Sequence, residues 1–297
     1  MPPTFGISHD LRRPTSDPTP LTDYYAQCLT EISEADRLGF DTVWLSEHHF
    51  TDDGMLPSSL VAAAAIAPRT ERIGIGTNIL VLPLHHPLRV AEDAAVVDLL
   101  SGGRLTLAVG QSYAAAEFAG LGVDRRERAS RLEEGIAVLR QAWDEPAVHH
   151  AGRHWRFDGV PVRPQPQRRI PLLVGAVAER AVERAVRLGD GLIVYCGKPA
   201  DVPARRQLLD RALANHPRVE FPLVLTGILH VAPDADQAWA EAAPGIAQRL
   251  IALHRETRFD HFAHWARLPG LPHERAIETL RLVAEQVLPV VQRVTTR

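Results

Sequence analysis

Short apolar runs alternate with amphipathic helical patterns along the whole chain, and this alternation constrains the fold more than any other feature. Strands that alternate with helices favour βαβ units and a parallel sheet. The runs that we predict to be strands are Thr4–Ser8, Thr42–Leu45, Ile73–Gly76, Leu105–Val109, Leu172–Val174, Leu192–Val194, Leu223–Val231 and Phe259–Trp265. The helical patterns lie near Tyr24–Leu38, Ser58–Ala67, Leu88–Leu100, Arg126–Trp143, Glu179–Leu188, Arg205–Ala214, Asp236–Leu253 and Glu274–Arg293.

Eight strand–helix pairs match the repeat number of a (β/α)8 TIM barrel, which is an α/β fold. The length of 297 residues suits one such domain with insertions, so we predict that residues 1–297 form a single domain. The alternation breaks at residues 148–171, which are rich in aromatic residues and proline, and we predict an inserted hairpin and loop after the fourth helix. A doubly wound sheet is the alternative, but it usually carries GxGxxG after its first strand, and none follows Thr4–Ser8.

The composition excludes several classes of function. A net charge of −3 and a pI near 6.5 give no basic surface for a nucleic-acid partner. Cys28 and Cys196 are far apart in the sequence, which argues against a disulfide framework, a thiolate zinc site or an iron–sulfur cluster. The first residues lack the pattern of a signal peptide, and no run of 18 apolar residues occurs, so we expect a soluble cytoplasmic protein without a membrane partner.

Three titratable residues, Glu47, His48 and His49, directly follow the second predicted strand. A carboxylate beside two imidazoles at this position is typical of proton-transfer or metal chemistry in α/β enzymes. The alternative interpretation is a surface turn that is rich in histidine. A zinc site would need further His or Asp ligands from other strand ends. Apart from His9 and His264, those ends offer none, so we expect no metal.

In a barrel, the residues that follow each strand surround one mouth. The third to sixth predicted strands are followed by Asn78-Ile79, Gly110-Gln111-Ser112-Tyr113, Gly175-Ala176-Val177 and Tyr195-Cys196-Gly197. This set combines polar donors with small residues that let a ligand approach the backbone. Where the fifth strand passes into a helix, free amides and Arg180 could bind phosphate, although an ordinary turn with a solvated Arg180 is the alternative.

Two groups of histidines are predicted to lie outside this mouth. His85-His86-Pro87 could line it, but the pattern favours the end of a loop and the start of a helix, with Pro87 in the first turn. His149, His150 and His154 belong to the insertion and are expected to be solvated.

The stretch from Gly39 to Leu139 resembles the bacterial luciferase-like flavin monooxygenases. The resemblance rests on several short motifs that occur in the same order. They are Trp44-Leu45-Ser46-Glu47-His48-His49-Phe50, Arg72-Ile73-Gly74-Ile75-Gly76-Thr77, Val81-Leu82-Pro83, His86-Pro87, Ala91-Glu92-Asp93, Leu99-Leu100-Ser101-Gly102-Gly103-Arg104-Leu105, Glu117-Phe118 and Leu121-Gly122.

The resemblance implies a barrel that holds a reduced flavin or a deazaflavin at its carboxyl mouth. It assigns the role of catalytic base to His48, and it implies a cis peptide bond between Asn78 and Ile79 under the ring. The implied cofactor-binding residues are Glu47, Asn78, Ile79, Gly110, Gln111, Ser112, Gly175, Ala176, Val177, Arg180 and Tyr195. The implied substrate pocket contains His9, His49 and Tyr113.

The chain departs from luciferase at two places. Gly110 and Gln111 replace a reactive cysteine beside the ring and an arginine that reaches the phosphate, and the phosphate-side serine and threonine are replaced near Val177 and Arg180. An altered phosphate pocket weakens the preference for FMN over the deazaflavin coenzyme F-420.

Our leading hypothesis is an oxidoreductase that uses reduced FMN, supplied by a separate flavin reductase, for monooxygenation of a small organic substrate. The alternatives are hydride transfer with coenzyme F-420 and, third, a non-catalytic flavin-binding partner subunit. A homodimer is expected, with the apolar helix Leu60–Ile66 as its candidate surface, and ordinary packing on the barrel is the alternative interpretation of this helix. Substrate choice is expected to depend on variable loops, chiefly Thr51–Pro57, Tyr113–Phe118 and the insertion at 148–171.

Overall fold

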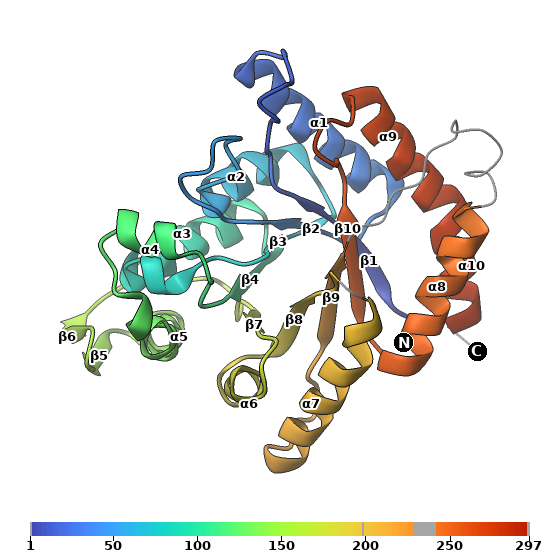
Figure 1. The fold of residues 1–297 in the computed structure, drawn as a ribbon. Coiled ribbons are helices and arrows are strands. Elements are labelled where there is room, and N and C mark those ends of the chain that lie inside the picture. The colour runs from blue at the N-terminus through green and yellow to red at the C-terminus, as the bar shows by residue number, and fades with distance from the viewer. Residues whose placement is uncertain (1, 198, 228–241, 296–297) are drawn as a thin grey trace.

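Eight parallel strands close into a barrel in the computed structural model, which describes residues 2–197, 199–227 and 242–295 (Figure 1). Around the barrel the strands follow the order β1-β10-β9-β8-β7-β4-β3-β2, and β2 pairs with β1 to close it. The strands are β1 (Thr4–His9), β2 (Thr42–Leu45), β3 (Gly74–Thr77), β4 (Leu105–Val109), β7 (Leu172–Gly175), β8 (Gly191–Tyr195), β9 (Leu223–Gly227) and β10 (His261–Trp265). The predicted (β/α)8 barrel is confirmed.

Helices surround the barrel on its outside (Figure 1). A π-helical turn over Val283–Val287 joins the last two of them. The helices are α1 (Leu21–Leu38), α2 (Ser59–Ile66), α3 (Pro87–Leu100), α4 (Ala115–Gly120), α5 (Arg128–Asp144), α6 (Glu179–Leu188), α7 (Val202–Asn215), α8 (Ala242–Thr257), α9 (His273–Leu282) and α10 (Leu288–Thr295). None of the helices within the described ranges is long and apolar enough to cross a membrane.

Most predicted elements are present with ends shifted by a few residues, and one prediction was wrong. Residues 113–118 were expected to form a loop, but Ala115–Gly120 forms the short helix α4, which buries Glu117 and Phe118. The run of alanine and glutamate has high helix propensity, and the burial of two side chains fixes it. The predicted ends of the strand at Val231 and of the helix at Asp236 lie outside the described residues.

Side chains fill the barrel interior. Trp44 lies there with Ala108, Leu173, Ile193, Val224 and Ala263, and Ile79 packs against this group from above. Gly76 is the neighbour of Trp44 on β3, and a β-carbon at Gly76 would clash with the indole ring, so glycine is required there. The interior is therefore a packed core, and a ligand would bind at the rim formed by the strand ends.

The predicted insertion is a hairpin of β5 (Val148–Ala151) and β6 (Arg156–Val160), which is held on α5 by one carboxylate. Glu134 accepts hydrogen bonds from the backbone N–H groups of His154 and Trp155 and from His150 Nε2 at 3.0 Å. The expectation that these histidines are solvated was wrong for His150 and His154, whose side chains are 13% and 4% exposed. His149 is solvated, with 66% of its side chain exposed. A buried carboxylate needs donors, and the hairpin supplies them.

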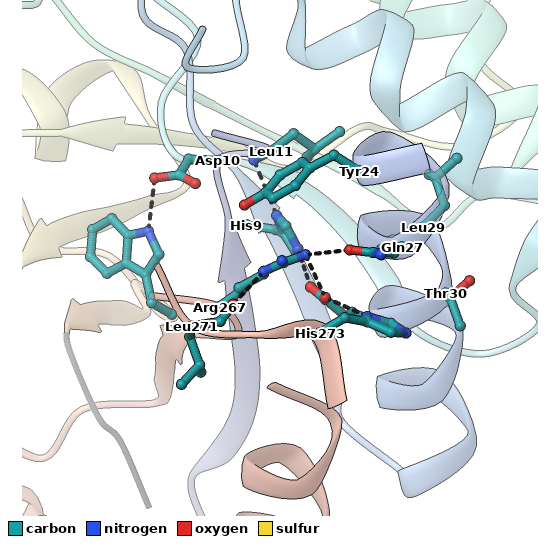
Figure 2. Close-up of polar contacts among 12 residues, drawn as sticks. His9, Asp10, Leu11, Tyr24, Gln27, Leu29, Thr30, Arg267, Leu271 and His273 are labelled. Atoms are coloured by element: carbon teal, nitrogen blue, oxygen red, sulfur yellow. Dashed lines mark hydrogen bonds and ion pairs between the residues drawn. The ribbon is translucent and has the colours of Figure 1, made fainter. Parts of the chain in front are cut away.

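A buried cluster around Glu31 of α1 fastens the seam where β1 meets β10 (Figure 2). Glu31 Oε2 accepts from His9 Nε2 at 2.9 Å, and Oε1 accepts from His273 Nδ1 at 2.8 Å. Arg267, just after β10, donates to the same Oε1 at 3.2 Å, and its guanidinium lies 4.2 Å from the ring centre of Tyr24. One carboxylate thus joins the end of β1, α1, the segment after β10 and the first residue of α9.

Replacing Glu31 with glutamine should lower the free energy of unfolding by about 3–5 kcal/mol, because the buried Arg267 would lose the nearer of its two counter-charges and keep only Asp17 at 3.7 Å. Denaturant unfolding of the full chain measures this. Asp23→Asn is the matched control, since Asp23 is an exposed acid on the same helix, and it should change stability by less than about 1 kcal/mol. A loss of similar size in both variants would contradict a special role for Glu31.

The Glu31 contribution should also depend on pH. Burial alone raises the pKa of Glu31, but hydrogen bonds from His273 and His9 and the charge of Arg267 outweigh it, so the pKa falls from its ordinary 4.5 to about 2. Because the pKa of Glu31 is lower in the folded state, ionised Glu31 stabilises the folded protein at pH values above the ordinary pKa. This stability is lost as the pH falls from 4.5 toward 2. The stability difference between wild type and Glu31→Gln should therefore shrink over that range.

Candidate active site

The ends of β2, β3, β4, β7 and β8 bring most of the predicted site residues to one rim of the barrel. Because the strands are parallel, their carboxyl ends face the same side. Three of the four non-glycine residues with positive φ in the described part of the chain follow the carboxyl ends of barrel strands: Leu11 after β1 (47°), Phe50 after β2 (59°) and Ser112 after β4 (52°). Such backbone is unfavourable for these residue types and concentrates at functional sites.

His48 is oriented by a buried carboxylate from α4. Its Nδ1 lies 2.8 Å from Oε1 of Glu117, which is 2% exposed. Glu117 also accepts from the backbone N–H of His49 at 3.2 Å and from Ser112 Oγ at 3.0 Å. A carboxylate that accepts at Nδ1 keeps the proton on that nitrogen, so Nε2 of a neutral His48 carries the lone pair. This is the arrangement of a general base.

Glu47 joins two histidines through one oxygen atom. Its Oε1 lies 3.0 Å from His49 Nε2 and 2.8 Å from His85 Nε2. Burial alone raises the pKa of Glu47, but the bonds from His49 and His85 outweigh burial and lower it, while the bond to Glu47 raises the pKa of His49. Glu47 is 3% exposed, and its Oε1 accepts the hydrogen bonds of both histidines. It therefore positions them at the rim.

Ile79 forms a platform at the centre of the rim. The peptide bond between Asn78 and Ile79 is cis, as the resemblance implied, and the Ile79 side chain lies over Gly110 and Gly175. A β-carbon at Gly110 would overlap Ile79 Cδ1. The two glycines were predicted to admit a ligand, but the side chain that approaches them is Ile79. Ile79 itself is partly exposed at the rim.

The opposite side of the rim is aromatic. Tyr195, 47% exposed, meets Trp265 edge to face at 5.6 Å, and Trp265 Nε1 donates to Asp10 Oδ2 at 3.3 Å. Near His48, the Tyr113 ring lies 6.3 Å from the imidazole and is 76% exposed. Two predicted site residues, Tyr113 and Tyr195, are thus accessible to solvent. A third, Gln111, is half-buried just after β4.

The predicted phosphate-binding segment leads from β7 into α6. Ala176 is buried, whereas Val177 is 53% exposed and Arg180 in the first turn of α6 is exposed. The N–H groups of Ala181 and Val182 already donate to the carbonyl oxygen of Ala178 at 2.9 Å, so within the first turn of α6 the N–H groups of Glu179 and Arg180 are the ones without a carbonyl partner in the helix. The segment presents backbone donors and one cation on the rim side of the barrel.

His9 lies apart from the other predicted site residues. It is 3% exposed, Nε2 is bonded to Glu31, and Nδ1 accepts the backbone N–H of Leu11 at 3.1 Å (Figure 2). Both ring nitrogens are therefore used inside the protein, and His9 contributes to the seam.

Two residues of the site, Glu117 and His85, were not predicted from the sequence to belong to it. Glu117 was noted as part of a motif, but its bond to His48 bridges 69 positions of sequence, which no local pattern reveals. His85 was expected to end a loop, and it does precede α3, with Pro87 as the first residue of that helix. It also turns toward Glu47. The signal available for both was a titratable side chain close to a strand end.

Comparison with known proteins shows the family of the chain. The chain matches the family model for luciferase-like monooxygenases over residues 4–288. It is 32% identical over 218 residues to an F-420-dependent glucose-6-phosphate dehydrogenase from Kineococcus radiotolerans, covering 70% of this chain and 64% of that relative. It is 33% identical over 168 residues to the alkanal monooxygenase alpha chain of Photorhabdus luminescens, covering 56% and 46%.

A solved structure agrees over nearly the full length. The fold matches monooxygenase RslO1 from Streptomyces bottropensis with a TM-score of 0.84 at 24% identity, covering 96% of this chain and 99% of that one. Between them, the matches to the two curated relatives span about half to two thirds of those proteins. The match over residues 4–288 extends from β1 into α10, and the chain belongs to the luciferase-like monooxygenase family.

Proposed function

We propose that this protein uses reduced FMN, supplied by a separate flavin reductase in the cytoplasm, to insert oxygen into a small organic substrate. The observation that carries the proposal is the His48–Glu117 pair, because it gives a base with a defined free nitrogen at the barrel mouth. The family of the chain and its similarity to two monooxygenases support this reaction type. We treat residues 1–297 as one functional domain.

The residues at the rim fit a flavin. Ile79 offers a half-buried apolar surface for one face of a planar ring, with Gly110 and Gly175 below it. The first turn of α6 and the exposed Arg180 offer backbone donors and a cation for a phosphate. When bound, the reduced cofactor would supply the electrons that activate oxygen.

The protein groups then have separate tasks. His48 removes or returns a proton through Nε2, and Glu117 keeps the ring oriented. Glu47 holds His49 and His85 in place at the same rim. Tyr113 and His49 would border the substrate, with Tyr113 lying against the His48 ring.

A second candidate keeps the fold and replaces the cofactor: hydride transfer with the deazaflavin coenzyme F-420. It is favoured by the relative named as F-420-dependent, which covers 70% of this chain, and by Gly110 and Gln111 at the positions where luciferase differs. A non-catalytic flavin-binding subunit is a third candidate, and the oriented His48 argues against it because binding alone needs no base.

Cofactor titration tests the proposal. We expect reduced FMN to bind with micromolar affinity, followed without oxygen by ligand fluorescence, with oxidised FMN and coenzyme F-420 binding more weakly. Turnover should consume oxygen when a flavin reductase is added. Micromolar binding of coenzyme F-420 without binding of FMN would replace the first function by the second. Binding of neither would reject both.

Replacing His48 with alanine should reduce turnover by roughly 10²–10⁴-fold, the usual contribution of a general base, and leave the affinity for reduced FMN nearly unchanged. Steady-state kinetics and the same binding titration measure the two effects. His149→Ala is the control, because His149 is exposed on the hairpin and should leave turnover unchanged. Equal turnover in wild type and His48→Ala would show that His48 is not the base.

We also propose a homodimer formed through α2 and α3, which pack side by side. Most of the predicted Leu60–Ile66 surface packs on the barrel, but Val61 is 71% exposed, and Val96, Leu99 and Leu100 on α3 are 41%, 38% and 57% exposed. An apolar patch across two neighbouring helices favours association.

The double substitution Val61→Glu with Leu100→Glu should convert a dimer into monomers, because it places a charge among the exposed apolar side chains of each helix. Light scattering after size exclusion should give about twice 32.7 kDa for the wild type and 32.7 kDa for the variant. Val219→Glu is the control, since Val219 is fully exposed away from this face. A monomeric wild type, or a variant that stays dimeric, would contradict the proposal.

A further inference from the structure

We propose that Glu47, His49 and His85 form a binding site for a divalent transition-metal ion such as Zn²⁺ at the barrel mouth. The three side chains come from the end of β2 and from the loop that precedes α3. The sequence offered too few ligands at the strand ends for a metal site, and His85 supplies the missing third ligand from outside them.

The three ligand atoms already converge. Oε1 of Glu47 lies 3.0 Å from His49 Nε2 and 2.8 Å from His85 Nε2, and all three atoms lie within 4.8 Å of one another. Zinc binds nitrogen and oxygen at about 2.0–2.1 Å, so tetrahedral ligands lie about 3.4 Å apart. Shifts of a fraction of an ångström to about one ångström would open the cluster around an ion.

The ligand chemistry selects the class of ion. Two imidazole nitrogens and one carboxylate oxygen suit Zn²⁺, Co²⁺ or Ni²⁺, whereas Mg²⁺ and Ca²⁺ prefer oxygen ligands alone. Three protein ligands leave a fourth position for water or a substrate atom. The side chains of His85 and His49 are 31% and 12% exposed, so an ion can reach the cluster from solvent.

Charge also favours this cluster. Glu117, a second buried carboxylate, accepts the N–H of His49 at 3.2 Å and places negative charge close by. A second set of possible ligands, His9, Cys28 and Glu31, differs in this respect. It is fully buried, and the guanidinium of Arg267 already lies 3.2 Å from Glu31, so a cation there would be repelled.

A bound ion would use the Nε2 atom of His49 and the oxygen of Glu47 directly beside His48. We expect it to inhibit the proposed reaction by fixing these side chains and narrowing the mouth. The inhibition rests on the proposed function, but metal binding itself does not, so the two can fail separately.

The test is a titration of the full chain, free of any polyhistidine tag and treated with chelator, with Co²⁺ followed by visible absorption. We expect one equivalent with the intense bands of a tetrahedral ion, displaced by Zn²⁺. Loss of a supporting second-sphere group already weakens metal sites about 10–100-fold, so His85→Ala, which removes a ligand, should weaken binding at least about 100-fold. His86→Ala is the matched control, an exposed neighbour outside the ligand set, and should bind like the wild type.

Circular dichroism confirms that each variant is folded, and His49→Ala provides a second ligand removal if His85→Ala does not fold. X-ray absorption of the Zn²⁺-loaded wild type should show nitrogen and oxygen neighbours at about 2.0–2.1 Å without sulfur at about 2.3 Å. Sulfur neighbours would move the ion to Cys28 and overturn the proposal. Absence of stoichiometric binding, or equal binding in His85→Ala and wild type, would also overturn it.

Discussion

Closure of the parallel barrel at β1 is the constraint on which the rest of the structure depends. β1 pairs with β2 on one side and β10 on the other, so the first and last strands of the chain must meet in register. Glu31 fastens that seam by joining α1 to His9, Arg267 and His273 (Figure 2). Because all strands run the same way, closure puts every carboxyl end on one rim.

Two buried carboxylates at this rim give neighbouring histidines different properties. Glu117 accepts a hydrogen bond from Nδ1 of His48 and leaves Nε2 of that ring without this partner, whereas Glu47 accepts a hydrogen bond from Nε2 of His49. Residues 48 and 49 are adjacent and identical in type, so the partner alone distinguishes them. The proposal that His48 is the base uses this difference, because His48 keeps Nε2 for a reactant, and the family resemblance implies the same role.

The sequence predicted the barrel and its rim because strand and helix periodicity is local, and because the order of strands decides which residues meet at the mouth. It did not predict pairs that depend on long-range approach, such as His48 with Glu117 or Glu47 with His85. His9 shows the reverse error, a residue that was predicted to belong to the site but lies outside it. Its place at a strand end suggested a pocket residue, but the partner that buries it lies on α1, and helix rotation is not readable from strand position.

Substrate selection is best sought in the loop after β2 and in α4. The loop is tied to the rim, because Leu56 accepts the N–H of His48 and donates to the carbonyl of Asp10, and Arg12 contacts Asp53 in the same loop. On α4, Glu117 orients the base while Tyr113 before it remains exposed. The hairpin of β5 and β6 is instead bound to α5 on the outside of the barrel through Glu134. A change in the loop or α4 alters the mouth and the orientation of His48 together, so under the proposed function substrate preference and proton transfer would depend on the same few contacts.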